Sequence, residues 1–149
     1  MQKPFLNQLN IVTGDFVRCE DFYRRVGIKF EPPLTPPGRE PFHRNGEDVC
    51  SNRVEFDSAE FAQIWNPGWA GRGDLNGRVV LGFTCPSRDE VDRIFRDLAD
   101  AGYRALAHPH DAFWGSRYAI VEDPNGIAVG LMSEIDPDYR SEPPAGFGD

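Results

Sequence analysis

The segment YAIVEDPNGIAVGL, residues 118–131, has the pattern of two β-strands joined by a tight turn. The four residues DPNG, 123–126, are of the types that favour turns, and apolar side chains alternate on both sides of them. In the second strand, Val129 and Leu131 point to one face, which we expect to be core, and Gly130 points to the other. A glycine inside a strand often marks the close approach of another group, so the face that carries Gly130 becomes a candidate site.

The order of elements that leads to this hairpin occurs twice along the chain. In the first half, a strand pattern in 5–14 precedes a helix that Asp15 can cap and that ends at Gly27, and a short strand follows at 28–31. In the second half, the strand pattern 78–85 precedes a helix that begins after Ser87 and ends near Gly102, and a strand follows at 103–108.

The end of the first half is less regular. Residues 53–66 have the pattern of two strands that meet near Asp57 and Ser58. The resulting order is β-α-β-β-β, twice, which predicts an α+β fold with two mixed sheets, each covered by a helix on one face. The other face of each sheet is then buried by the second sheet, by a partner chain or by a ligand.

Three segments fall outside this pattern. Residues 32–48 form a long connection rich in Pro, Gly and charge, and a loop of that length is usually functional or mobile. Residues 66–77 form a Gly-rich connection between the halves. Residues 134–149 have little that could bury a face, so we expect a mostly disordered tail, the alternative being an arm over a neighbouring molecule.

Composition narrows the class of protein. The chain has 149 residues, of which 40% are hydrophobic and 27% charged, as in ordinary globular domains. A net charge of −8 argues against binding to nucleic acid or an anionic membrane. The three cysteines are widely spaced, and the N-terminal residues lack the apolar segment of a signal peptide, so we expect reduced thiols and a cytoplasmic location.

Three motifs resemble the vicinal oxygen chelate superfamily, which includes glyoxalase, bleomycin-resistance and extradiol-dioxygenase proteins. They are GDFVRCEDFYRRVGIKF (14–30), SRDEVDRIFRDLADAG (87–102) and, most specifically, WGSRYAIVEDPNG (114–126). The resemblance covers residues 5–133. It implies a single glyoxalase-like domain, 1–133, built from modules at about 5–66 and 78–133, with the tail 134–149 outside it. It also implies curled mixed sheets around a cavity, with the modules paired within one chain or between the chains of a homodimer.

Metal-dependent members of this superfamily carry ligands on the first and last strand of each half. The resemblance places these positions at Gln8, Glu60, Val80 and Gly130. Valine and glycine have no side chain that binds a cation, and the other two residues are too few for a dedicated divalent site. We therefore expect neither a metal nor another cofactor.

Other residues have alternative interpretations. His108 and His110 could converge as a metal pair if they lie in a strand, but a loop that lines the ligand pocket fits Pro109 better. Trp65 and Trp114 are candidates for core or for the pocket mouth. Glu60 could be a general base in an apolar cavity or a solvated carboxylate with no role. Arg117 could form a surface ion pair with Glu122 or Asp123, or hold an acidic ligand group.

These observations favour a protein of the bleomycin-resistance-like branch that binds a small, aromatic or antibiotic-like molecule in a metal-free cavity. Gln8, Asn10 and Glu60 would form a polar wall, and Val80, Gly82 and Gly130 an apolar one. The alternatives are a glyoxalase-like lyase, isomerase or dioxygenase, and a dimeric domain without a ligand. Whether the protein is an enzyme stays open at this point. The full set of expected ligand-binding residues is Gln8, Asn10, Glu60, Trp65, Val80, His108, His110, Trp114 and Gly130.

Overall fold

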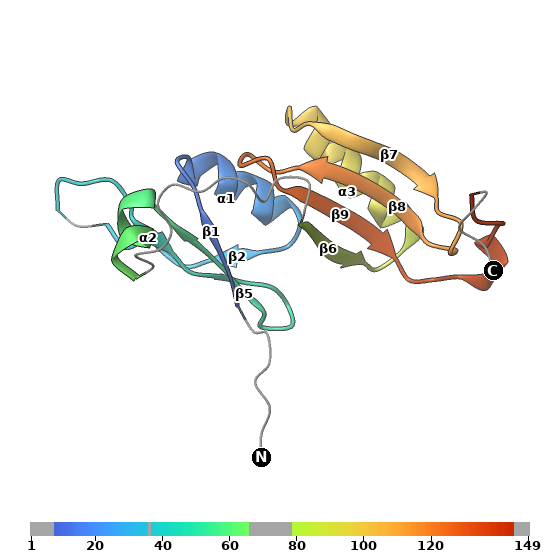
Figure 1. Ribbon diagram of the computed structural model, residues 1–149, viewed down its shortest axis with the longest axis horizontal. Coiled ribbons are helices and arrows are strands. Elements are labelled where there is room, and N and C mark those ends of the chain that lie inside the picture. The colour runs from blue at the N-terminus through green and yellow to red at the C-terminus, as the bar shows by residue number, and fades with distance from the viewer. Residues whose placement is uncertain (1–7, 36, 66–78, 145–149) are drawn as a thin grey trace, which may run out of the picture. The chain divides into compact units, whose positions relative to one another are not determined.

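The computed structural model describes residues 8–35, 37–65 and 79–144, except for the side chains of Gln63 and Trp65. The chain divides into two compact units, unit 1 (Met1–Asp74) and unit 2 (Leu75–Asp149), which Figure 1 shows with their helices and strands labelled. Each unit has a mixed sheet and a helix of its own, so each is described separately. No helix among the described residues is long and apolar enough to cross a membrane.

Unit 1 is a sheet of short strands with one face covered by a helix. Its strands are ordered β1-β5-β4-β2, with β3 paired to β5, and β1 and β5 run parallel so that Asn10 lies opposite Glu55. Rings of the helix and the sheet meet in the core, where Tyr23 lies 5.4 Å from Phe56 between ring centroids. The elements are β1 (Gln8–Val12), α1 (Phe16–Arg25), β2 (Lys29–Phe30), β3 (His43–Arg44), β4 (Gly46–Glu47), β5 (Arg53–Asp57) and α2 (Ala59–Trp65).

The first helix forms as its sequence predicts. The side chain of Asp15 accepts a hydrogen bond from the backbone nitrogen of Arg18 at 3.0 Å, which satisfies a donor in the first turn. After the last turn, Gly27 adopts φ +100°, a conformation that glycine takes without strain.

The prediction of two strands in residues 53–66 is half wrong. Residues 53–57 are the strand β5, but a helix, α2, follows it. Ser58 starts this helix, because its hydroxyl accepts from the nitrogen of Phe61 and its carbonyl accepts from the nitrogen of Ala62. The middle strands of the sheet, β3 and β4, come instead from the expected loop 32–48 and the residues around it.

Unit 2 has the predicted order of elements throughout. Its strands are ordered β6-β9-β8-β7, with β6 and β9 parallel, and α3 covers one face (Figure 1). The hydroxyl of Ser87 accepts from the nitrogen of Glu90 at the start of α3. In the turn between β8 and β9, the carboxylate of Asp123 accepts from the nitrogens of Asn125 and Ile127. The elements are β6 (Val80–Cys85), α3 (Arg88–Asp100), β7 (Ala105–Asp111), β8 (Arg117–Glu122), β9 (Ala128–Ser133) and η1 (Pro137–Tyr139).

The start of the expected tail has a defined path. The nitrogen of Asp136 donates to the carbonyl of Gly115, and the nitrogen of Ser141 donates to the carbonyl of Phe113, each at 3.1 Å. The guanidinium of Arg88 lies 3.7 Å from the ring centre of Tyr139. Residues 134–144 are therefore held to the turn between β7 and β8 by backbone hydrogen bonds and to α3 by a cation–π contact. The expected disorder is wrong for this segment, although it buries no apolar face. Residues 145–149 lie outside the described part.

Candidate functional site

Each sheet has one face that the long helix of its unit does not cover, and we call it the open face of that unit. The open face of unit 1 carries Gln8, Asn10, Glu55 and Asp57, because these residues alternate along β1 and β5. Histidine His43 of β3 joins them, since it pairs with Asp57. This open face is polar.

His43 is the centre of a buried hydrogen-bond cluster on this face. Its Nδ1 lies 2.6 Å from Oδ1 of Asp57, and its Nε2 lies 2.8 Å from Oδ1 of Asn45. The side chain of Asp57 is 1% exposed and that of His43 is 14% exposed. Since Nδ2 of Asn45 donates to Glu31, its oxygen faces His43, and both ring nitrogens therefore meet acceptors.

This environment favours the protonated imidazole. Burial works against the charge, but the hydrogen bonds to Asp57 and Asn45 and the nearby carboxylates of Asp57 and Glu55 outweigh it. Together they raise the pKa of His43 above its ordinary value. A positive charge on His43 is thus favoured by the two buried carboxylates beside it.

Gln8 and Asn10, two of the expected binding residues, belong to this cluster. Nδ2 of Asn10 donates to Asp57 at 2.8 Å, and Nε2 of Gln8 donates to Glu55 at 3.1 Å. Beside Glu55 lies a cleft of about 320 Å³, which Asn45 and Arg53 also line. Glu55 was not among the expected site residues, although the alternation of Arg53, Glu55 and Asp57 along one strand indicates a polar face.

Glu60 does not have the predicted position. It lies on α2 and not on the last strand of the first half, and it is solvent-exposed with an ion pair to Arg39 at 2.6 Å. The strand prediction failed because Ser58 begins a helix directly after β5. The last strand places two other carboxylates on the open face, Glu55 in the same row as Asn10 and Asp57 at the end of the strand.

The open face of unit 2 is mostly apolar and is built around two glycines. Gly82 on β6 lies opposite Gly130 on β9, and Val80, one row away, is 53% exposed. A Cβ placed on Gly130 would lie 2.9 Å from the hydroxyl oxygen of Tyr118, so Gly130 makes room for the phenol ring. A Cβ on Gly82 would meet no described atom within 4 Å.

Aromatic side chains continue this face beyond the glycines. The ring of Tyr118 has its centroid 5.5 Å from that of Trp114 and 6.0 Å from that of His110. His108 does not join them, because its ring packs against Phe95 of α3 on the covered face. The expected loop around Pro109 is wrong, because β7 continues to Asp111. The two histidines still separate, because the pairing of β7 with β8 shifts between Ala107 and His110.

Two further predictions concern Arg117 and Trp65. We expected an ion pair between Arg117 and Glu122 or Asp123, and these described residues do not form one. Instead, the guanidinium of Arg117 binds both carboxylate oxygens of Asp92 on α3, at 2.8 and 3.1 Å, and also contacts Asp111. The side chain of Trp65 lies outside the described part of the structure, so its predicted place in the pocket has no structural account.

A family model describes this chain. The model of the glyoxalase/bleomycin resistance protein/dioxygenase superfamily matches residues 5–131. The chain belongs to this superfamily. No curated protein sequence matches it at a significant level.

Solved structures of superfamily members share the fold. A family enzyme from Burkholderia phytofirmans PsJN has a TM-score of 0.70 and 20% identity, with 86% of this chain and 97% of that chain covered. A protein from Nocardioides with the superfamily description has a TM-score of 0.69 and 19% identity, covering 99% and 92%. A glyoxalase-related enzyme from Fulvimarina pelagi has a TM-score of 0.69 and 18% identity, covering 90% and 89%. At these identities the likeness establishes the fold alone.

The residues of unit 2 do not fit the divalent metal that the superfamily resemblance implies. The two positions expected for ligands hold Val80 and Gly130, and the ring of Tyr118 lies over the second. Among the described residues, no group of three or more His, Cys, Asp or Glu side chains has an arrangement suited to a metal ion. The open face of unit 2 can offer apolar and aromatic contact, and that of unit 1 can offer charge and hydrogen bonds.

Proposed function

We propose that this superfamily member binds a small, flat, partly polar organic molecule, of the aromatic or antibiotic-like kind that the bleomycin-resistance-like branch would take. The site uses no metal. The observation that carries the proposal is the open face of unit 2, where Gly82 and the half-exposed Val80 leave an apolar surface beside the ring of Tyr118, which Gly130 accommodates.

The chemistry of this face fits a planar ligand. Gly82 leaves the backbone of β6 without a side chain, so a flat molecule can approach the sheet there, beside the Tyr118 ring that covers Gly130. The rings of Tyr118 and Trp114 supply stacking surface at one end of the face. Apolar burial and stacking would supply affinity, and a few polar groups would set orientation, as in most small-molecule sites.

The variant that tests this proposal is Gly82→Leu. Because a Cβ at Gly82 meets no described atom, the leucine should fill the flat surface without disturbing the fold. Ligands found by thermal shift in a library of aromatic heterocycles should lose at least about tenfold in affinity, as expected for loss of a well-formed apolar contact. Gly14→Leu is the matched control, since Gly14 is exposed in unit 1 and its Cβ also meets no described atom. Equal affinity in the wild type and Gly82→Leu would remove the proposal.

A second candidate function is favoured by the position of Glu55. Its side chain is 9% exposed and lies beside the 320 Å³ cleft, so this carboxylate could be the base of a lyase or isomerase in place of Glu60. Glu55→Gln should then abolish turnover while ligand binding is retained. Loss of turnover in Glu60→Gln, with Glu55→Gln active, would contradict this assignment.

A further inference from the structure

A separate groove lies in unit 1 between residues 38–42 and α2. Its volume is about 620 Å³, within the range of pockets that hold small molecules. Phe42 on one side and Phe61 and Ile64 on the other line it. Glu60, one of the expected binding residues, also lines this groove, whereas none of the lining residues belongs to unit 2.

The two sides of the groove are held together before any ligand arrives. The backbone nitrogen of Ser58 donates to the carbonyl of Phe42 at 2.9 Å, which fixes the start of α2 to the loop. The rings of Phe42 and Phe61 meet edge to face with centroids 4.8 Å apart, and Phe61 also contacts the ring of His43 at 5.6 Å. Since His43 is bound to the buried Asp57, the aromatic wall is anchored in the sheet.

The groove exposes apolar surface that the fold does not use. Ile64 is 74% exposed although it lies on a helix whose inner residue, Ala62, is fully buried. Single exposed apolar residues are common and need no explanation. Here, however, the exposed isoleucine faces a cavity that two phenylalanines and Pro41 also line.

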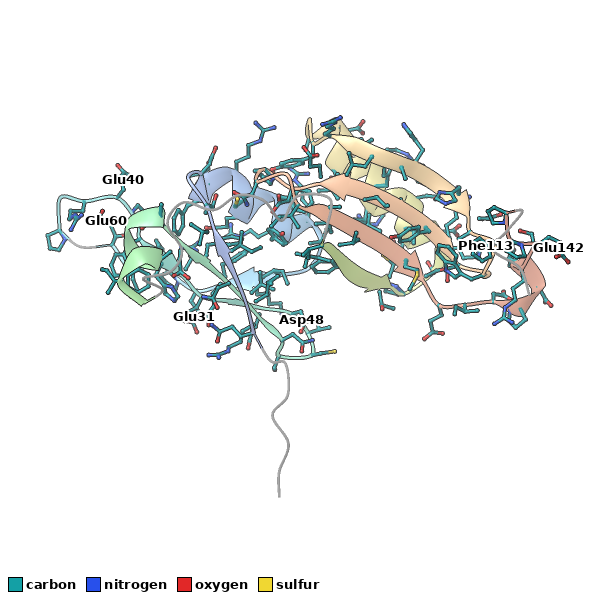
Figure 2. All side chains as sticks on the ribbon, in the orientation of Figure 1. Glu31, Glu40, Asp48, Glu60, Phe113 and Glu142 are labelled. Atoms are coloured by element: carbon teal, nitrogen blue, oxygen red, sulfur yellow. The ribbon has the colours of Figure 1, made fainter. Side chains whose placement is uncertain are left out.

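The charge at the rim indicates which polar group a ligand would carry. Arg39 and Glu60 neutralise each other in an ion pair at 2.6 Å. Glu40 also lines the groove and has no hydrogen-bond or ion-pair partner among the described residues. Figure 2 shows Glu40 on the loop and Glu60 on α2 at the same end of unit 1. The rim thus holds one carboxylate that has no counter-ion within the described part of the chain, whose net charge is −8 overall.

We propose that this groove is a second ligand site, which takes a small aromatic molecule with one positive charge, such as an aromatic amine. The ring packs against Phe42, Phe61 and Ile64, and the ammonium group pairs with Glu40. The faces of aromatic rings also attract a cation, so the two phenylalanines add to the attraction of the Glu40 carboxylate. An anion of the same shape meets the Glu40 carboxylate and is disfavoured.

The experiment compares two probes with the same ring and opposite charge, tryptamine and indole-3-propionate. Backbone amide shifts of the ¹⁵N-labelled full chain report where each probe binds and with what affinity. We expect tryptamine to shift the amides of 38–42 and 58–64 and to bind more tightly than indole-3-propionate. Equal affinities, or shifts confined to unit 2, would overturn the proposal.

Single variants separate the contribution of the Glu40 charge from that of the apolar contact with Ile64. Glu40→Gln should weaken tryptamine by about twofold to fivefold, the range for an exposed ion pair, and leave indole-3-propionate unchanged. Ile64→Ser should weaken both probes. The matched controls are Glu47→Gln and Val49→Ser, exposed residues of unit 1 that do not line this groove. If Ile64→Ser and Val49→Ser behave alike, the groove is not the site.

Gly82→Leu separates this proposal from the proposed function. Tryptamine binding in the groove should be unaffected by it, because Gly82 belongs to unit 2. Loss of tryptamine binding in Gly82→Leu would overturn the groove and support the open face of unit 2 instead. Retained binding in Gly82→Leu, together with loss in Ile64→Ser, would establish the groove whatever ligand the other face takes.

Discussion

At the scale of single residues, Gly130 shows how a missing side chain shapes a face. The phenol of Tyr118 occupies the space that a Cβ at Gly130 would need, with ring and hydroxyl atoms 2.9–3.3 Å from that position. Gly130→Ala should therefore lower the free energy of unfolding by about 1–3 kcal/mol, the usual cost of overpacking. Urea unfolding measures this loss.

The double variant tests the cause. In a Tyr118→Ala background the space is open, so adding Gly130→Ala should cost clearly less than it does alone. If the two losses simply add, the ring of Tyr118 is not what excludes a side chain at Gly130. The same contact makes Gly130→Leu unsuitable for testing ligand binding, because it would disturb Tyr118 as well as block the face.

Gly115 has a different requirement, set by the backbone. It adopts φ +103°, and a Cβ there would overlap the carbonyl oxygen of Asp136, which belongs to the segment after β9. Gly115→Ala should lower the free energy of unfolding by about 1–3 kcal/mol because of backbone strain. The overlap of the new Cβ with the carbonyl oxygen of Asp136 should increase this loss. Gly102→Ala is the matched control, since Gly102 has φ +90° but open space around its Cβ among the described residues. Similar losses in both variants would show that Asp136 does not press on Gly115.

At the scale of elements, the sequence predicts those whose local and tertiary signals agree. The helices α1 and α3 have a capping side chain, an apolar stripe and a terminal glycine, and the β8–β9 hairpin has a turn that Asp123 closes. Residues 53–66 lack this agreement. The apolar residues after Ser58 suit a strand or a short helix, and only the hydrogen bonds of Ser58 to Phe61 and Ala62 decide for the helix.

The position of Glu55 follows from that choice. Because β5 ends at Asp57, its carboxylates on the open face are Glu55 and Asp57, and Glu60 lies in the solvent beside Arg39. Residues His43 and Asn45 could not be predicted as site residues either. His43 lies in a two-residue strand and Asn45 directly after it, both within an expected loop where no hydrophobic periodicity marks a face.

The pairing of β3 with β5 through His43 and Asp57 makes the stability of the fold depend on pH. Because the pKa of His43 is raised in the folded chain, the pair stabilises the fold fully below the unfolded pKa, about 6.5. This contribution is lost as the pH rises through the folded pKa. Imidazole resonances should therefore show His43 titrating above the ordinary pKa of a histidine.

The variant Asp57→Asn tests the cause of this shift. Removing the carboxylate should lower the pKa of His43 and flatten the decline of stability with rising pH. His108→Gln is the control, because the ring of His108 packs against Phe95 in unit 2. An unchanged pKa of His43 in Asp57→Asn would contradict the role of the pair, as would a shift of equal size in His108→Gln.

At the scale of the whole molecule, the two units have the same plan and open faces of opposite character. In unit 1 the alternating residues of β1 and β5 are polar, and in unit 2 those of β6 and β9 are small or apolar. Alternation along strands is a local property, so the sequence predicted Gln8, Asn10, Val80 and Gly130 on these faces. The ring contacts of Tyr118 depend on the irregular register of β7 against β8, which shifts between Ala107 and His110, and they could not be predicted.

The opposite character of the faces leads to a prediction about metal binding. A divalent ion needs at least three or four donor atoms, and in unit 2 the expected positions, Val80 and Gly130, supply none. In unit 1, the side chains of Gln8, Asn10 and Glu55 already bind one another. Releasing them for a metal would break a part-buried network, which costs free energy that the ion must first offset.

We therefore expect protein purified without a metal-affinity tag to contain well below one divalent ion per chain. Nickel, zinc, manganese and iron(II) should leave the melting temperature unchanged. An ion held at a hundred times its dissociation constant would stabilise the fold by about 2.7 kcal/mol, which a thermal scan resolves easily. A stabilisation of that size, removed by Glu55→Gln but not by Glu60→Gln, would contradict the metal-free site. It would show that the open face of unit 1 rearranges to bind the ion.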